Sequence, residues 1–215
     1  RTSSGKDALM TDSSLQPAEL KEQIRKTAHA NRRAQDDKES ISREIMSRFM
    51  ALPEYHAAES VMFYVDVRAE VRTRFDLQAA IDSGKRIIVP YCVDGELELF
   101  HLESMDELEE GAYSILEPRA DLRLVPEKQV DVTEIDLIMV PGVGFDSSGG
   151  RAGHGKGYYD KLLEHARLDT PLVAVAFDCQ IFPHIPVQSH DVYMDKVLTQ
   201  SQAYEGIGRT PVNPK

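Results

Sequence analysis

The sequence has few cysteines and no long hydrophobic run, and both absences limit its class. Its two cysteines, Cys92 and Cys179, do not form a CxxC pair. This leaves neither a disulfide framework nor a zinc–cysteine cluster, which fits a reducing, cytoplasmic location. No apolar run approaches the roughly 20 residues of a membrane span. We therefore expect a chain that does not enter a membrane.

Basic residues are scarce relative to acidic ones. The chain has 25 Lys and Arg against 36 Asp and Glu, which gives a formal net charge of -11. Such a charge repels nucleic acid and anionic lipid over most of the surface. A small anion can still bind where a few basic groups and backbone amides converge. We expect a small-molecule partner, and neither a nucleic acid nor a membrane.

The length of 215 residues suits one compact domain better than two. Residues 1–9 are polar and Met10 is a possible natural start, so we expect a leader there that is either added during cloning or disordered. The domain would then occupy residues 10–203. Residues 204–215 are rich in Gly and Pro and are expected to form a loose tail. We expect a monomer.

Apolar residues at helical spacing predict two amphipathic helices near the amino terminus. The repeating positions are Leu20, Ile24 and Ala28, then Ile41, Ile45 and Phe49. A further helix is expected at residues 75–81, ended by Gly84.

Short β-rich segments predict the strands of a sheet. They span residues 60–67, 86–91, 97–101, 135–140 and 172–177. The last two are apolar runs, interrupted only by Asp136, which is typical of strands buried on both faces. Strands that alternate with helices favour a single three-layer α/β domain, with a mainly parallel sheet and helices on both faces. Ligands of such folds bind beyond the carboxyl ends of the strands.

A glycine-rich loop follows the expected strand at 135–140 and reads PGVGFDSSGGRAGHGKGYYD from Pro141 onward. Its glycines let successive amide groups turn toward a phosphate, because positive φ angles cost them little. They are Gly149, Gly150, Gly153, Gly155 and Gly157. Arg151 and Lys156 add positive charge. The loop is followed by a helix that begins near Tyr158, and an alternative reading is a flexible surface loop.

Two common nucleotide-binding motifs do not fit this loop. A Walker A loop needs Ser or Thr after its Gly-Lys pair to hold magnesium, and Gly157 stands there instead. A Rossmann fingerprint needs GxGxxG, whereas Gly153, Gly155 and Gly157 give GxGxG. The loop therefore predicts a phosphate site of another kind.

The pattern PG-x-x-FD followed by R-x-G-x-G-x-GYYD resembles the 5-formyltetrahydrofolate cyclo-ligase family. The matching positions are Pro141, Gly142, Phe145, Asp146, Arg151, Gly153, Gly155 and Gly157 to Asp160. Two positions depart from the family's pattern, since Ala152 replaces the usual Leu and His154 replaces a frequent Arg. The resemblance also covers residues 21–25, Glu70, residues 113–118 and an ending with Asp191, Asp195 and Thr199.

The resemblance implies an ATP- and Mg²⁺-dependent ligase that closes 5-formyltetrahydrofolate to 5,10-methenyltetrahydrofolate. Arg151 and Lys156 would be catalytic, and Asp160 and Asp191 would hold the magnesium. ATP would be bound by Lys21, Arg25, Arg151, Ala152, Gly153, His154, Gly155, Lys156, Gly157, Tyr158 and Tyr159. The folate would be bound by Val65, Glu70, Tyr113, His154, Gly155, Lys156, Gly157 and Tyr158. Glu70 suits this role because a carboxylate accepts two hydrogen bonds from a pterin edge.

Two other readings stay open at this point. One is a folate- or nucleotide-binding homologue that has lost turnover, since a fold and its ligand site can outlast the chemistry. The other is a phosphosugar-binding protein of related architecture, which would also need a glycine-rich anion loop. Such a protein would not need Glu70 or Tyr113, and it would ignore folinate.

Overall fold

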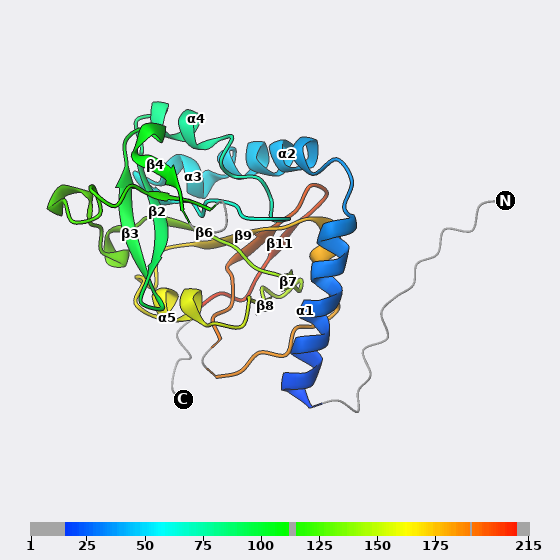
Figure 1. Ribbon diagram of the computed structural model, residues 1–215. Helices are drawn as coiled ribbons and strands as arrows, with labels where there is room; N and C mark the ends of the chain where they lie inside the picture. The colour runs from blue at the N-terminus through cyan, green and yellow to red at the C-terminus, as the bar shows by residue number, and fades with distance from the viewer. Residues whose placement is uncertain (1–15, 112–114, 190, 210–215) are drawn as a thin grey trace.

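The computed structural model describes residues 16–111, 115–189 and 191–209, which form one α/β domain around a seven-stranded sheet (Figure 1). The strand order is β11-β10-β9-β6-β1-β2-β3. These strands are β1 (Ser60–Met62), β2 (Arg86–Val93), β3 (Glu96–Leu102), β6 (Leu137–Val140), β9 (Leu172–Val175), β10 (Lys196–Leu198) and β11 (Ala203–Glu205). The inner strands pair in parallel, and only β3 and β11 at the two edges pair antiparallel. The expected mainly parallel sheet is confirmed.

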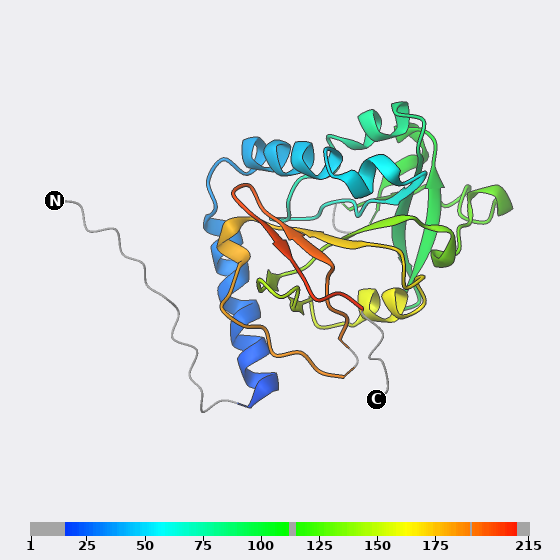
Figure 2. The same cartoon turned by 180° about the vertical axis from the view of Figure 1, so that it is seen from behind.

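Helices cover both faces of this sheet, as the two opposite views show (Figures 1 and 2). The helices are α1 (Pro17–Ala34), α2 (Lys38–Met50), α3 (Pro53–Ala57), α4 (Leu77–Asp82) and α5 (Tyr158–Glu164). Short 3₁₀ turns are η1 (Met105–Glu107), η3 (Pro126–Lys128), η4 (Val132–Glu134) and η5 (Asp178–Gln180). Two small hairpins are formed by β4 (Leu108–Glu110) with β5 (Leu116–Pro118), and by β7 (Gly144–Phe145) with β8 (Arg151–Ala152). None of the helices in these ranges is long and apolar enough to cross a membrane.

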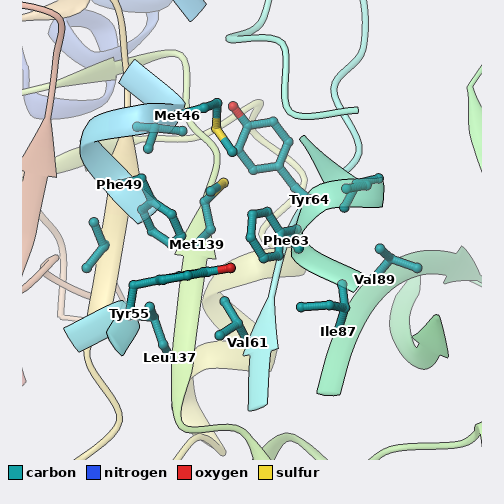
Figure 3. Close-up of a cluster of buried hydrophobic side chains, with 14 of the residues drawn as sticks. Met46, Phe49, Tyr55, Val61, Phe63, Tyr64, Ile87, Val89, Leu137 and Met139 are labelled. Atoms are coloured by element: carbon teal, nitrogen blue, oxygen red, sulfur yellow. The ribbon is translucent and has the colours of Figure 1, made fainter. Parts of the chain in front are cut away.

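The core alternates between the two faces of the sheet because successive side chains of a strand point in opposite directions. On one face, odd-numbered residues of the central strands pack against α2, α3 and α4 (Figure 3). These include Val61, Ile87, Val89, Leu137 and Met139, which meet Phe49 and Tyr55. On the other face, Met62, Ile88, Ile138 and Val140 pack toward Leu163 and Ala166 in and after α5. Every residue of β6 and β9 is buried, as their apolar runs predict.

Helix α1 lies apart from these layers, against the glycine-rich loop. Its apolar residues Ile24 and Ala28 pack on Val143 and Ala152 of the loop rather than on the sheet. The face that carries them also buries Lys21 and Arg32 at its two ends. The helix therefore presents basic groups to the loop.

The strand expected at 60–67 is wrong beyond Met62. Phe63 still donates its N–H to the carbonyl of Ile88 at 2.9 Å, but Tyr64 and Asp66 form backbone hydrogen bonds with Thr73 instead of with the sheet. The hydroxyl of Thr73 donates to the carbonyl of Tyr64 at 2.5 Å, and it accepts from the amide of Asp66 at 3.2 Å. The freed segment then lines the cleft described below.

The expected loose tail from residue 204 is also wrong as far as Arg209. Tyr204 and Glu205 belong to β11, which extends the sheet beyond the predicted boundary at residue 203. Arg209 then donates hydrogen bonds to four carbonyl groups around the end of α5, at 2.7 to 3.2 Å. Residues 210–215 lie outside the described residues, as do the leader at 1–9 and Met10.

Candidate active site

A cleft of about 530 Å³ opens beyond the carboxyl ends of β1, β2 and β6. Its walls are the outer part of the glycine-rich loop, one face of α1, the segment that follows β1, and the hairpin of β2 and β3. This is the place where a parallel α/β sheet binds ligands.

Most of the residues that sequence analysis proposed for the site line this cleft. They are Lys21, Arg25, Val65, Glu70, Arg151, Gly153, His154, Gly155, Lys156, Gly157, Tyr158, Tyr159, Asp160 and Asp191. Ala152 does not line it, because its side chain is buried against α1. Tyr113 lies outside the described residues.

The glycine-rich loop begins as a tightly packed foot, residues 141–152. Phe145 pairs with Arg151 across the β7–β8 hairpin. Asp146 is buried below, where its carboxylate accepts backbone N–H groups from Ser148, Gly150 and Ile185 at 2.8 to 2.9 Å. These bonds stabilise the turn, so the motif aspartate has a structural role and does not face the cleft.

The loop continues as an exposed rim, residues 153–157, which faces the cleft. Arg25 reaches from α1 and donates a hydrogen bond to the carbonyl of Gly153 at 2.9 Å. Gly155 and Gly157 have φ angles of +93° and +70°, which few other residues adopt. Lys156 stands between them with an exposed side chain, 5.7 Å from the ring centroid of Tyr158. The rim thus offers backbone groups and the exposed cation of Lys156 to an anionic ligand.

Two cation–carboxylate pairs lie at the base of the cleft. Arg151 donates to Asp160 at 2.7 Å, and its other terminal nitrogen donates to the carbonyl of Pro141 at 3.2 Å. Lys21 lies 2.5 Å from Asp191, with both side chains 9% exposed. The pairs place two carboxylates and two cations around one space, an arrangement suited to a phosphate group with its metal ion.

Glu70 lies deep in the cleft, and its carboxylate accepts few hydrogen bonds. Its carboxylate accepts one backbone N–H, from Val67 at 3.0 Å, and lies 3.5 Å from Nε2 of His154. Burial raises the pKa of Glu70 to about 7, against the opposing influence of that hydrogen bond and of Arg32. Partial burial, with Arg32 nearby, lowers the pKa of His154 to about 4. The contact therefore joins a neutral imidazole to a carboxyl group that titrates near neutral pH.

Sequence analysis missed the apolar wall of the cleft. Pro90, Tyr91 and Cys92 of β2 and Leu97 of β3 form it. The turn of their hairpin is Asp94-Gly95, with φ angles of 49° and 84°. An Asp-Gly pair between two alternating segments is a strong hairpin signal and was available in the sequence.

Arg32 was missed as well. It is 3% exposed, and it donates to the carbonyl of Gly142 at 3.3 Å, behind the loop. Burial lowers the pKa of its guanidinium. Arg32 lies on the same buried face of α1 as Lys21, and this face packs against the loop. Its helical spacing from Lys21 could therefore have indicated that Arg32 lies near the site.

Comparison with known proteins gives a consistent picture. The sequence profile of the 5-formyltetrahydrofolate cyclo-ligase family matches residues 17–200. A Schizosaccharomyces pombe protein named "Probable 5-formyltetrahydrofolate cyclo-ligase" is 31% identical, with 80% of this chain and 88% of that protein covered. The 5-formyltetrahydrofolate cyclo-ligase of Mus musculus is 30% identical, with 84% and 90% covered.

A solved structure of similar fold agrees with the sequence matches. The NMR structure of Aquifex aeolicus 5,10-methenyltetrahydrofolate synthetase superposes with a TM-score of 0.74 at 29% identity, over 91% of this chain and 97% of that one. The profile match covers most of the chain, and it includes both α1 and the glycine-rich loop. The chain therefore belongs to the 5-formyltetrahydrofolate cyclo-ligase family.

Proposed function

We propose that the chain catalyses the ATP- and Mg²⁺-dependent closure of 5-formyltetrahydrofolate to 5,10-methenyltetrahydrofolate, with release of ADP and phosphate. Family membership supports the reaction. The observation that carries it is the meeting, in one cleft, of a glycine-rich rim and cations from α1 with the buried carboxylate of Glu70. A phosphate donor and a pterin need these two kinds of group.

The phosphates of ATP would lie along the rim. Lys156 is exposed there, and Arg25 fixes the rim through the carbonyl of Gly153. Backbone amides of residues 153–157 and the two cations Lys21 and Arg151 would supply the remaining donors. Arg151 is anchored by Asp160 and Pro141, so its charge is held in place before a ligand arrives.

The donor set of the cleft fits magnesium. Asp160 and Asp191 supply hard carboxylate oxygens, and Mg²⁺ is commonly held by one or two carboxylates plus substrate phosphates and water. Within residues 16–209 as described, no three His, Cys, Asp or Glu side chains gather to hold a metal by themselves. Asp160 and Asp191 would hold the ion in the cleft, where it would supply positive charge to the phosphates of ATP.

The folate would occupy the part of the cleft around Glu70. Glu70 offers a carboxylate to the amino group and ring N–H of the pterin, beside Val65. The apolar wall of Pro90, Tyr91 and Leu97 would exclude water from the reacting formyl group.

In the proposed reaction the oxygen of the N5-formyl group attacks the γ-phosphorus of ATP, and ADP leaves. The lone pair of N10 then attacks the activated formyl carbon, N10 loses its proton, and the carbon–oxygen bond breaks to release phosphate. An amide-like oxygen is a weak nucleophile, so the barrier falls mainly through positioning and charge neutralisation. Lys156 and Arg151 would stabilise the charge of the phosphoryl group during both steps.

The test follows methenyl-folate absorbance while the protein is mixed with folinate, magnesium and ATP, with an ATP-free control. A rise that depends on ATP supports the proposal. Folinate binding without any such rise would mean a binding protein, and no response to folinate would favour a phosphosugar ligand.

The magnesium ligands are tested separately. Asp160→Asn and Asp191→Asn are each expected to raise the magnesium concentration for half-maximal rate by about tenfold, the order seen when a ligand shell is weakened. A variant that titrates with magnesium like the parent removes its residue from the metal site.

A further inference from the structure

We infer that His154 is a positioning residue for Glu70, and that folate binding to this chain requires the His154–Glu70 pair to lose a proton. The inference rests on the proposed function, because it takes Glu70 as the acid that receives the pterin. It concerns how the two side chains act together.

The geometry joins the two side chains inside the cleft. Nε2 of His154 lies 3.5 Å from Oε1 of Glu70; the Glu70 side chain is 7% exposed, whereas that of His154 is 45% exposed at the mouth of the contact. In the described part of the chain, His154 is the one Lys, Arg or His side chain within the 4.0 Å ion-pair distance of this carboxylate. The His154 ring itself lies 5.8 Å from the ring of His29, which contacts Arg32 at 3.2 Å. The ring of His154 thus lies between His29 of α1 and Glu70.

Other charged or titratable groups that act on Glu70 come from three elements. The segment after β1 contributes Tyr64, Asp66 and Arg72, α1 contributes Arg32, and α5 contributes Tyr159. Asp66 is fully buried and is already paired with Arg72 and Arg74 at 3.1 to 3.2 Å. These arginines therefore neutralise Asp66 first, and Glu70 keeps little direct compensation for its charge.

The chemistry of the pair follows from this environment. When Glu70 is protonated, its O–H can donate to a bare imidazole nitrogen; when it is ionised, the imidazole N–H can donate to it. Only the ionised carboxylate accepts two hydrogen bonds from the amino group and N–H of a pterin edge. Substrate binding therefore selects the ionised form, and the proton leaves to solvent.

The directions of titration agree with this geometry. Burial raises the pKa of Glu70 to about 7, and partial burial with Arg32 nearby lowers the pKa of His154 to about 4. Partial burial also lowers the pKa of His29, with Arg32 acting in the same sense. Near neutral pH the imidazole is uncharged and cannot hold Glu70 in its ionised form by charge alone.

The experiment measures the KM for folinate at saturating Mg-ATP between pH 6 and pH 8. For the parent, KM should be about tenfold higher at pH 6 than at pH 8, since a group with pKa about 7 must ionise first. His154→Arg places a permanent cation beside Glu70 and should reduce this change to less than about twofold. His154→Gln is a neutral donor and acceptor like the imidazole; its KM values can differ from the parent's, but the roughly tenfold ratio between pH 6 and pH 8 should persist. The exposed His165→Gln, outside the cleft, is the matched control.

A second readout needs no turnover. Folinate binding without ATP, followed by calorimetry at pH 7 in two buffers of different ionisation enthalpy, should release about half a proton from the parent. Glu70→Gln should release none. A parent KM that is constant from pH 6 to pH 8, or an Arg variant that keeps the parent's profile, overturns the inference.

The two proposals fail in different ways. Proton release on folinate binding, without ATP-dependent product, would end the proposed function and leave the pair intact. Product formation with a pH-independent KM would end the inference alone. A protein that does not bind folinate contradicts both.

Discussion

The foot and the rim of the glycine-rich loop use the same residue for different reasons. In the foot, a Cβ added to Gly149 would lie 2.3 Å from the carbonyl oxygen of Met194, and one added to Gly150 would lie 2.5 Å from Asp146. On the rim, Gly155 has no neighbour nearer than 3.9 Å, and Gly157 has none within 4 Å. In the foot, glycine is needed because there is no space, with a left-handed φ of +88° as a second reason at Gly149; at Gly155 and Gly157 on the rim, backbone conformation is the reason. One motif therefore combines a packing requirement with a ligand requirement.

Each half of the loop also has its own carboxylate. Asp146 in the foot accepts three backbone N–H groups and is satisfied. Glu70, which contacts the rim at His154, accepts one, and burial raises its pKa to about 7. A fully bonded carboxylate stabilises the fold, whereas a poorly bonded one is available to a ligand.

The largest expected effect is a loss of turnover without a loss of stability, caused by a substitution on the rim. Lys156→Ala should lower turnover by about 10²- to 10³-fold, the usual loss when one preorganised donor to a transition-state charge is removed. Because the side chain is exposed, the free energy of unfolding should stay within about 0.5 kcal/mol of the parent's. Steady-state kinetics and urea unfolding measure the two quantities. Lys161→Ala, an exposed lysine on α5, is the control. Unchanged turnover would remove Lys156 from the mechanism.

The next effect concerns the foot. Gly149→Ala should lower the free energy of unfolding by about 3 kcal/mol, since overpacking and a left-handed φ of +88° both act against the new methyl group. The loss should appear as a lower urea midpoint with an unchanged slope. Wild-type stability in this variant would contradict the packing interpretation.

The two carboxylates should respond to neutralisation with opposite signs. The pKa of Glu70 is about 7 in the folded chain against 4.5 in the unfolded one, so its favourable contribution is complete below about pH 4.5 and is lost as the pH rises through 7. Glu70→Gln mimics the protonated form and should be more stable than the parent at pH 8, by on the order of 2 kcal/mol. Asp146→Asn should be less stable at the same pH, because an amide NH₂ would face backbone donors. Urea unfolding at pH 5 and pH 8 tests both variants, and a Glu70→Gln gain of equal size at pH 5 would contradict the linkage.

Sequence patterns predicted the layers of the fold because the signal is local. Continuous apolar runs at β6 and β9 and helical spacing in α1 and α2 depend only on neighbouring residues. The ends of elements were less predictable. β1 ends at Met62, and Tyr64 and Asp66 bond to Thr73, which is too distant in the sequence for a local pattern to reveal. β11 is a three-residue strand whose pairing with β10 leaves no periodic signal.

The residue types of the site could be predicted from the sequence, but which of them stabilise the loop and which face the ligand could not. The loop and its basic residues could be found from composition, yet nothing local distinguishes Gly149 from Gly157. The difference arises from Met194 and Gly206, which are distant in sequence and cross the foot of the loop. Likewise, Asp146 and Glu70 are both acidic residues, and the sequence does not show which one faces a ligand. Only their hydrogen bonds distinguish the structural carboxylate from the one that lines the cleft.

The smallest expected change in the free energy of unfolding, that of Gly157→Ala, best distinguishes the rim from the foot. Gly157→Ala should cost only about 1 kcal/mol, because the open space leaves the left-handed φ of +70° as the sole penalty. Asn tolerates that conformation, so Gly157→Asn should recover most of the loss. Gly149→Asn should recover none, since the carbonyl of Met194 blocks any Cβ. Urea unfolding of the four variants tests this: if Asn restores stability at both positions, lack of space does not govern the foot, and the division between the two halves of the loop does not hold.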